Sequence, residues 1–143
     1  MSVPLAVALG IIAFAAAFHL HWAFGGKIGH SVSLPQRGDG HTVLAHQIGW
    51  WRWGSAGVAI GLGMVAAMAL SVAGFIQLPL PPSIARGLLV AIGVAFVLRS
   101  IVPTPWTGFF KSIRTTRWAK YDTRLYSPLF LVLGLSLIVL SRN

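Results

Sequence analysis

The chain has 143 residues, of which 56% are hydrophobic and only 9% are charged, whereas about a quarter of the residues in an average soluble protein are charged. A soluble domain of this length could not bury so much apolar surface, so the composition indicates an integral membrane protein. The formal charge of +9 comes from 11 Lys and Arg residues set against Asp39 and Asp122. Basic residues beside apolar runs are typical of proteins that meet lipid headgroups, which argues against nucleic acid as a partner. Because the chain has no cysteine, disulfides, thiolate catalysis and thiolate-bound metals are excluded.

Four apolar segments suit membrane-spanning helices. The first has Pro4 in its opening turn, where the missing N–H costs nothing, and we interpret it as a retained helix rather than a signal peptide. The second begins beside a tryptophan cluster at headgroup level, and prolines bound the third. The sequence therefore predicts an all-α, integral membrane four-helix bundle in a single domain, with spans at about 2–24, 54–78, 84–102 and 125–141.

The last apolar segment is short if Ser127 and Pro128 are taken as the N-cap and first residue of its helix. About 13 residues would then cover roughly 20 Å of a hydrocarbon core that is roughly 30 Å thick. Either this helix starts earlier, near Arg124, or the chain before it dips into the membrane.

The basic residues are concentrated in two loops, and an even number of spans places those loops on one side. We therefore expect both loops to be cytoplasmic and both termini to face outward, in a bacterial cytoplasmic (inner) membrane. The opposite side carries only Arg86 and Arg142. The two loops hold Lys27, Arg37, Arg52, Lys111, Arg114, Arg117, Lys120 and Arg124.

Unusually deep polar residues converge on that side. His19 lies about five residues, or roughly 7 Å, before the end of the first span, and Trp22 follows on the same helix face. Arg99 lies one turn before the end of the third span, and Asp122 is its natural partner, because an unpaired charge at that depth is costly. We predict a polar pocket below the cytoplasmic surface, formed by His19, Trp22, Arg99, Asp122, Arg124 and Tyr126.

Each polar residue also has a simpler interpretation. Arg99 could extend to the headgroups without lining a pocket. Asp122 could be a counter-charge that holds the third loop against the membrane. His19 could bond a neighbouring carbonyl or a water. No catalytic residue can be assigned, and whether the protein is an enzyme stays open.

Histidines give no metal or haem pattern. His19 and His21 point about 200° apart on a regular helix, and the later spans contain no histidine. His30, His41 and His46 lie in the first loop at spacings that match no recognised ligand set, so their role stays open. We expect no metal and no cofactor. The spans carry no carboxylate, which disfavours proton-coupled transport.

Two further patterns concern packing. Gly57 and Gly61 form a small-xxx-small pair in the second span, for which internal helix packing is the favoured interpretation over a dimer contact. The third loop, residues 106–121, alternates aromatic and basic residues and is expected to lie at the membrane interface.

Two segments resemble a known family. Residues 19–26, with His19, Trp22, Gly25 and Gly26, look like the His-x-x-Trp-x-x-Gly-Gly motif of a bacterial family of small four-helix membrane proteins known only as a domain of unknown function, of the 3995 type. Residues 121–129 are similar to that family's Asp-x-x-x-Tyr-Ser-Pro-Leu segment, which assigns Asp122, Tyr126, Ser127 and Pro128 to its motif. The resemblance implies a four-helix membrane fold and no particular activity. It has no counterpart for the first loop, residues 31–53.

Two functions fit these observations. The protein would bind or act on a small amphiphilic or lipid-soluble molecule at the polar pocket, where His19 exchanges a proton or hydrogen bond and Arg99 holds an anionic group. Alternatively, it is a non-enzymatic accessory subunit of a larger membrane complex, respiratory or photosynthetic. The expected partners are membrane lipids and, in the second case, other membrane subunits.

Overall fold

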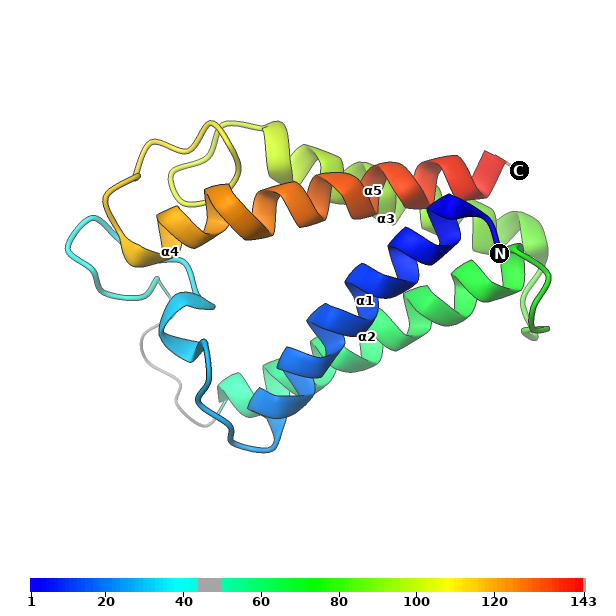
Figure 1. Cartoon of the computed structure of the whole chain (residues 1–143), viewed down its shortest axis with the longest axis horizontal. Coiled ribbons are helices and arrows are strands. Elements are labelled where there is room, and N and C mark those ends of the chain that lie inside the picture. Colours follow the sequence, from blue (N-terminus) through cyan, green and yellow to red (C-terminus); the bar gives the residue numbers. More distant parts are fainter. Residues whose placement is uncertain (44–49, 143) are drawn as a thin grey trace.

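The computed structural model describes residues 1–43 and 50–142, and within them the chain is helical apart from its loops and one isolated β-bridge between Gln36 and Thr42. Four helical segments, which we call rods, are long and apolar enough to cross a membrane. This confirms the predicted all-α four-helix membrane architecture. Both termini lie at one end of the bundle, which we call the terminus end, and the two long loops lie at the other, the loop end (Figure 1). In chain order the elements are α1 (Val3–Ala23), η1 (His30–Val32), α2 (Trp50–Val72), α3 (Pro82–Ile101), α4 (Arg117–Tyr121), η2 (Asp122–Tyr126) and α5 (Ser127–Arg142). The fourth rod combines α4, η2 and α5.

The fourth rod is not short, which corrects the span expected at 125–141. Helical structure is continuous from Arg117 to Arg142, and these 26 residues reach about 39 Å. Ser127 and Pro128 therefore do not begin the helix. They lie inside it, directly after the π-helical turn η2, in which the Ser127 N–H donates to the Asp122 carbonyl five residues back.

Pro128 explains why the helix widens there. Proline has no N–H to donate, and its ring clashes with the carbonyl four residues before it in a regular α-helix. A π turn is one of the few distortions that lets a helix pass a proline without ending. Ser127 and Pro128, which we had interpreted as the start of a helix, therefore mark a distortion inside one.

The second span is also displaced from the expected 54–78, because α2 runs from Trp50 to Val72. Gly74, two residues after the end of α2, adopts the left-handed conformation with a φ of 80°. The Gly74 and Phe75 N–H groups donate to the Ser71 and Leu70 carbonyls, a pattern that closes a helix and sends the chain away. The apolar residues after Val72 belong to the connecting loop.

The helices associate as two pairs, α1 with α2 and α3 with α5, and the pairs converge toward the terminus end (Figure 1). The dry core lies in that half of the bundle, where side chains from all four rods are buried together. Its members are Leu5, Ala8, Ile12, Val65, Met68, Ala69, Leu89, Leu133, Leu137 and Leu140.

Glycines set the closest helix crossing, but not those expected. A Cβ on Gly93 of α3 would stand 2.7 Å from the Gly134 carbonyl oxygen of α5, and one on Gly134 would stand 2.6 Å from the Gly93 carbonyl oxygen. The two backbones can approach this closely only because both residues lack side chains. Gly57 and Gly61 of α2 are exposed instead, with open space where a Cβ would stand, so the interpretation as internal packing was wrong.

Candidate functional site

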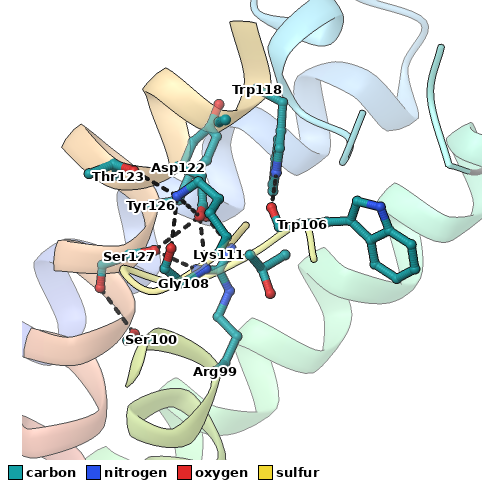
Figure 2. Close-up of polar contacts among 12 residues, drawn as sticks. Arg99, Ser100, Trp106, Gly108, Lys111, Trp118, Asp122, Thr123, Tyr126 and Ser127 are labelled. Atoms are coloured by element: carbon teal, nitrogen blue, oxygen red, sulfur yellow. Dashed lines mark hydrogen bonds and ion pairs between the residues drawn. The ribbon is translucent and has the colours of Figure 1, made fainter. Parts of the chain in front are cut away.

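A buried charge cluster lies at the loop end, centred on Asp122 at the start of η2 (Figure 2). The Asp122 side chain is fully buried. Its Oδ1 accepts from Arg99 Nη2 at 2.6 Å, and its Oδ2 accepts from the Gly108 N–H at 2.9 Å, Lys111 Nζ at 3.0 Å and Ser127 Oγ at 3.2 Å. Four donors, two of them cationic, offset the cost of removing this carboxylate from water. The predicted pairing of Arg99 with Asp122 is confirmed.

The π turn supplies the geometry for this cluster. In a regular α-helix, side chains five residues apart point about 140° apart. The wider turn brings Asp122 and Ser127 toward the same side, so that one guanidinium reaches both: Arg99 Nη1 donates to Ser127 Oγ at 3.0 Å while Nη2 binds Asp122. The π turn beside Pro128 thus places two side-chain acceptors where the Arg99 guanidinium can bond both of them.

Lys111 is the second cation of the cluster, and its side chain is only 1% exposed. Its ammonium donates to Asp122 Oδ2, to the Gly108 carbonyl at 2.7 Å and to Thr123 Oγ1 at 2.6 Å. These three bonds use all three ammonium donors. Sequence reasoning missed Lys111, because nothing distinguishes it in the sequence from its basic neighbours in the third loop.

The third loop is held against the end of α3 by this cluster. Gly108 has a φ of 87°, and a Cβ there would stand 2.9 Å from the carbonyl oxygens of Arg99 and Ser100. The next residue, Phe109, donates its N–H to the Ser100 carbonyl. Asp122 therefore does anchor the third loop, as the simpler interpretation expected, and it orients Arg99 at the same time.

Arg99 connects the cluster to the bundle interior. Its guanidinium carbon lies 4.4 Å from the centre of the Phe130 ring, a cation–π contact. The side chain remains 21% exposed, and the bonds to Asp122 and Ser127 use two of the five guanidinium N–H donors. Arg99 is therefore anchored on one side and accessible on the other.

The end of α1 is shaped by its glycine pair. Gly25 adopts a φ of 91°, and the Gly25 and Gly26 N–H groups donate to the Trp22 and His21 carbonyls, which closes the helix as Gly74 closes α2. A Cβ on Gly26 would overlap the His21 ring, whose Nε2 accepts from the Ile28 N–H. Each glycine of the pair thus has its own physical requirement.

His19 and Trp22 lie beside one another near that end. The two rings meet edge to face with centroids 5.0 Å apart, and Trp22 Nε1 donates to the Ile28 carbonyl at 2.7 Å. His19 lies seven residues after Ile12 and shares its core-facing side of α1, yet it is only partly buried. Among the residues that the structure describes, its buried Nδ1 has no hydrogen-bond partner.

The first loop docks onto the fourth rod. Tyr126 Oη donates to the Val32 carbonyl at 3.0 Å, and the Trp118 N–H donates to Gln36 Oε1 at 3.0 Å. The Trp118 and Tyr126 rings also pack together, with centroids 5.2 Å apart. Tyr126 is thus engaged with the loop backbone rather than with Arg99.

Four of the six predicted pocket residues form two separate pairs in the structure. Arg99 and Asp122 bind one another, and His19 and Trp22 pack together, but within residues 1–43 and 50–142 no hydrogen bond or ion pair joins the two groups. Arg124 is exposed, and the pocket as a whole stays a prediction. The same described residues contain no cluster of three His, Asp or Glu side chains that could hold a metal ion. His46 lies outside them, so the role of the loop histidines stays open.

Comparison with known protein families gives a match. Neither the curated proteins nor the solved structures include a similar chain. The match is to the family described as a protein of unknown function (DUF3995), and it covers residues 5–137. That range includes both motif segments, the Asp122 cluster and the greater part of each of the four spanning helices. The chain therefore belongs to the DUF3995 family.

Proposed function

We propose that the protein binds a small amphiphile with an anionic head in the loop-end half of the bundle, with Arg99 as the anchor for the head. The observation that carries this proposal is how the Arg99 guanidinium is held and how much of it is exposed. Its guanidinium is oriented by Asp122 and Ser127, contacts an aromatic face, and keeps free donors on an accessible side. A guanidinium held in this way suits a carboxylate or phosphate.

On the core-facing sides of α1 and α5 the side chains become less buried toward the loop end, and we place the apolar chain of the ligand there. On α1 the side is fully buried at Leu5, Ala8 and Ile12 but only partly buried at His19. On α5 it is buried at Leu137 and only partly buried at Phe130. Residues that face the middle of a bundle without being buried leave room for an apolar ligand.

The charge balance supports an anion. The cluster contains two cations and one carboxylate, and both carboxylate oxygens are already bonded. Lys111 has no donor left, so Arg99 carries the excess positive charge. An anionic head would neutralise that charge at a depth where an unpaired cation is costly.

The other residues take supporting roles in this proposal. Asp122 and Ser127 position Arg99, and Tyr126 holds the first loop over the fourth rod. His19 offers a ring nitrogen with no partner to a polar group of the ligand. We propose binding rather than catalysis, because the carboxylate that would serve as a base is committed to four donors.

The head-binding end would face the cytoplasm of a bacterial cell, because most of the basic residues are in the two loops at that end. The absence of native cysteine makes this topology simple to test. In spheroplasts, a cysteine at Asp39 should be protected from an impermeant maleimide, whereas one at Ser2 should react. The reverse pattern would contradict the orientation.

Dodecyl phosphate tests the binding proposal directly. It should raise the Tm of the purified protein in dodecyl maltoside, and Arg99→Lys should lower the apparent affinity roughly tenfold, because lysine keeps the charge but loses the planar fork. Arg86→Lys is the matched control, since Arg86 is exposed at the opposite end of α3. Equal affinity for wild type and Arg99→Lys would reject Arg99 as the anchor.

The role of accessory subunit keeps one specific observation in its favour. Gly57 and Gly61 present an exposed, side-chain-free strip on α2, which another helix could approach closely. Extraction of a tagged chain in native membrane discs would test this role. Partner subunits retained by wild type and Gly87→Leu but lost from Gly61→Leu would support it, and a chain recovered alone would reject it.

A further inference from the structure

One face of the fourth rod carries basic side chains that the cluster does not use. Arg117 and Lys120 of α4 and Arg124 of η2 are all exposed, and Tyr121 is exposed between them. Within the described residues, no hydrogen bond or ion pair engages their side-chain nitrogens or the Tyr121 hydroxyl. We call Arg117, Lys120, Tyr121 and Arg124 the basic face.

The helical segment from Arg117 to Arg124 has one buried side and one exposed side. Trp118, Ala119 and Asp122, which lie between the members of the basic face in sequence, are buried. The helix is therefore fixed in rotation by its inner side, and the cations are held outward in a row. From Arg117 to Arg124 that row covers roughly 10 Å along the helix axis, somewhat more than the roughly 5–8 Å of the headgroup region on each side of a bilayer.

The protein itself cannot neutralise this row. The sequence has two acidic residues. Asp122 is enclosed by its four donors, and Asp39 accepts from the His41 N–H in the first loop. The counter-charge for the basic face must therefore come from outside the chain.

We propose that the basic face binds the headgroups of anionic phospholipids in the leaflet at the loop end. Arg124 lies nearest the hydrocarbon and meets the lipid phosphate, while Lys120 and Arg117 meet the outer parts of the headgroups. Exposed aromatic residues of the third loop, Trp106 and Phe110, are the residue types that settle at the same interface. A row of cations on a rigid helix beside such residues fits a charged lipid surface.

Tryptophan quenching by brominated lipids can measure this preference. All six tryptophans lie near the loop end in sequence, so their fluorescence reports on lipids there. In vesicles of phosphatidylcholine, added dibromo-phosphatidylglycerol should quench more strongly than added dibromo-phosphatidylcholine, because the basic face concentrates it. The positions are Trp22, Trp50, Trp51, Trp53, Trp106 and Trp118.

The decisive comparison is a triple variant, Arg117→Gln with Lys120→Gln and Arg124→Gln. Each cation near an anionic surface contributes about fivefold in binding, and we expect the triple variant to lose at least tenfold in relative affinity for phosphatidylglycerol. Arg86→Gln, at the opposite end of the bundle, should keep the preference. Raising the salt from 0.05 to 0.5 M should weaken it in wild type.

A triple variant that folds and still prefers phosphatidylglycerol as strongly as wild type would overturn the proposal. Folding is checked by its helical circular dichroism, and a single variant, Lys120→Gln, should show about a fivefold loss if the triple variant fails to fold. The basic face does not depend on the Arg99 site. The triple variant should still bind dodecyl phosphate, and Arg99→Lys should still prefer phosphatidylglycerol, so the two proposals can fail separately.

Discussion

The two halves of the bundle are stabilised by different physics. The terminus-end half is a dry core in which leucine, isoleucine and small residues from all four rods exclude lipid, and α3 crosses α5 at a pair of glycines. The loop-end half has few buried apolar side chains and is held by a buried carboxylate with two cations. The terminus-end half is thus held by apolar packing, and the loop-end half keeps polar side chains, such as that of Arg99, partly exposed.

The two halves should therefore respond to different kinds of substitution. A core without polar groups is destabilised by changes of side-chain volume, whereas a buried ion cluster is destabilised by the loss of one partner. A substitution in one half is therefore best compared with the same kind of substitution at a position that makes no such contact.

The largest effect is expected for Asp122→Asn. The change leaves Lys111 and Arg99 close together without a counter-charge, which should lower the free energy of unfolding by about 3–5 kcal/mol. Unfolding in mixed dodecyl maltoside and dodecyl sulfate micelles, followed by tryptophan fluorescence, measures it. Asp39→Asn is the control, because an amide oxygen can still accept from the His41 N–H. Equal stability of the two variants would show that the cluster does not hold the loop end.

At the terminus end, Gly93→Ala should cost about 1–3 kcal/mol, because the new methyl group would enter the backbone of α5. Gly87→Ala, in the same helix but with open space around its Cβ position, should be neutral or slightly stabilising, since alanine favours helix. The same micelle titration compares them. If Gly93→Ala were as stable as Gly87→Ala, the glycine crossing would not be the close contact described.

Ser127→Ala should cost about 1 kcal/mol, because it removes the hydroxyl that bonds both Arg99 and Asp122. Ser136→Ala, a partly buried position further along α5, should change stability by less. Ser127→Ala should also weaken dodecyl phosphate binding, since Arg99 loses one of the two side chains that accept its hydrogen bonds. Unchanged binding would show that the π turn does not position Arg99.

The smallest effect is expected for Tyr126→Phe, which removes the hydrogen bond to the Val32 carbonyl and should cost about 0.5–1.5 kcal/mol. The loss should appear locally, as faster amide hydrogen exchange in residues 30–43, with little change in α1. Tyr121→Phe is the control, because Tyr121 is exposed and its hydroxyl makes no bond to the described residues. Equal exchange in both variants would contradict the docking of the first loop on the fourth rod.

Much of the fold could be predicted because apolar run length is a direct requirement of the bilayer. The four rods, the common end of the loops and the Arg99–Asp122 pair all follow from it. The structure also explains why particular residue types stand at the motif positions. Gly25 closes α1, Gly26 makes room for the His21 ring, and Pro128 accounts for the π turn.

The remainder depended on contacts far apart in sequence. Pro128 gives the same local signal at a helix start and at a helix distortion, and only the packing of α4 decides between them. Lys111 looks like any other loop cation until the chain folds back to bring it to Asp122. Gly57 and Gly93 are alike in sequence context, yet only Gly93 faces another helix.

We propose above all that an anionic amphiphile binds beside Arg99 in the loop-end half of the bundle. Photolabelling with an alkyl phosphate that carries a diazirine in its chain, followed by peptide mass spectrometry, tests it most directly. We expect labels on the core-facing side of the loop-end half, at His19 and Phe130, and competition by dodecyl phosphate. Labels confined to outward-facing residues such as Val94 and Leu98, without competition, would contradict the claim.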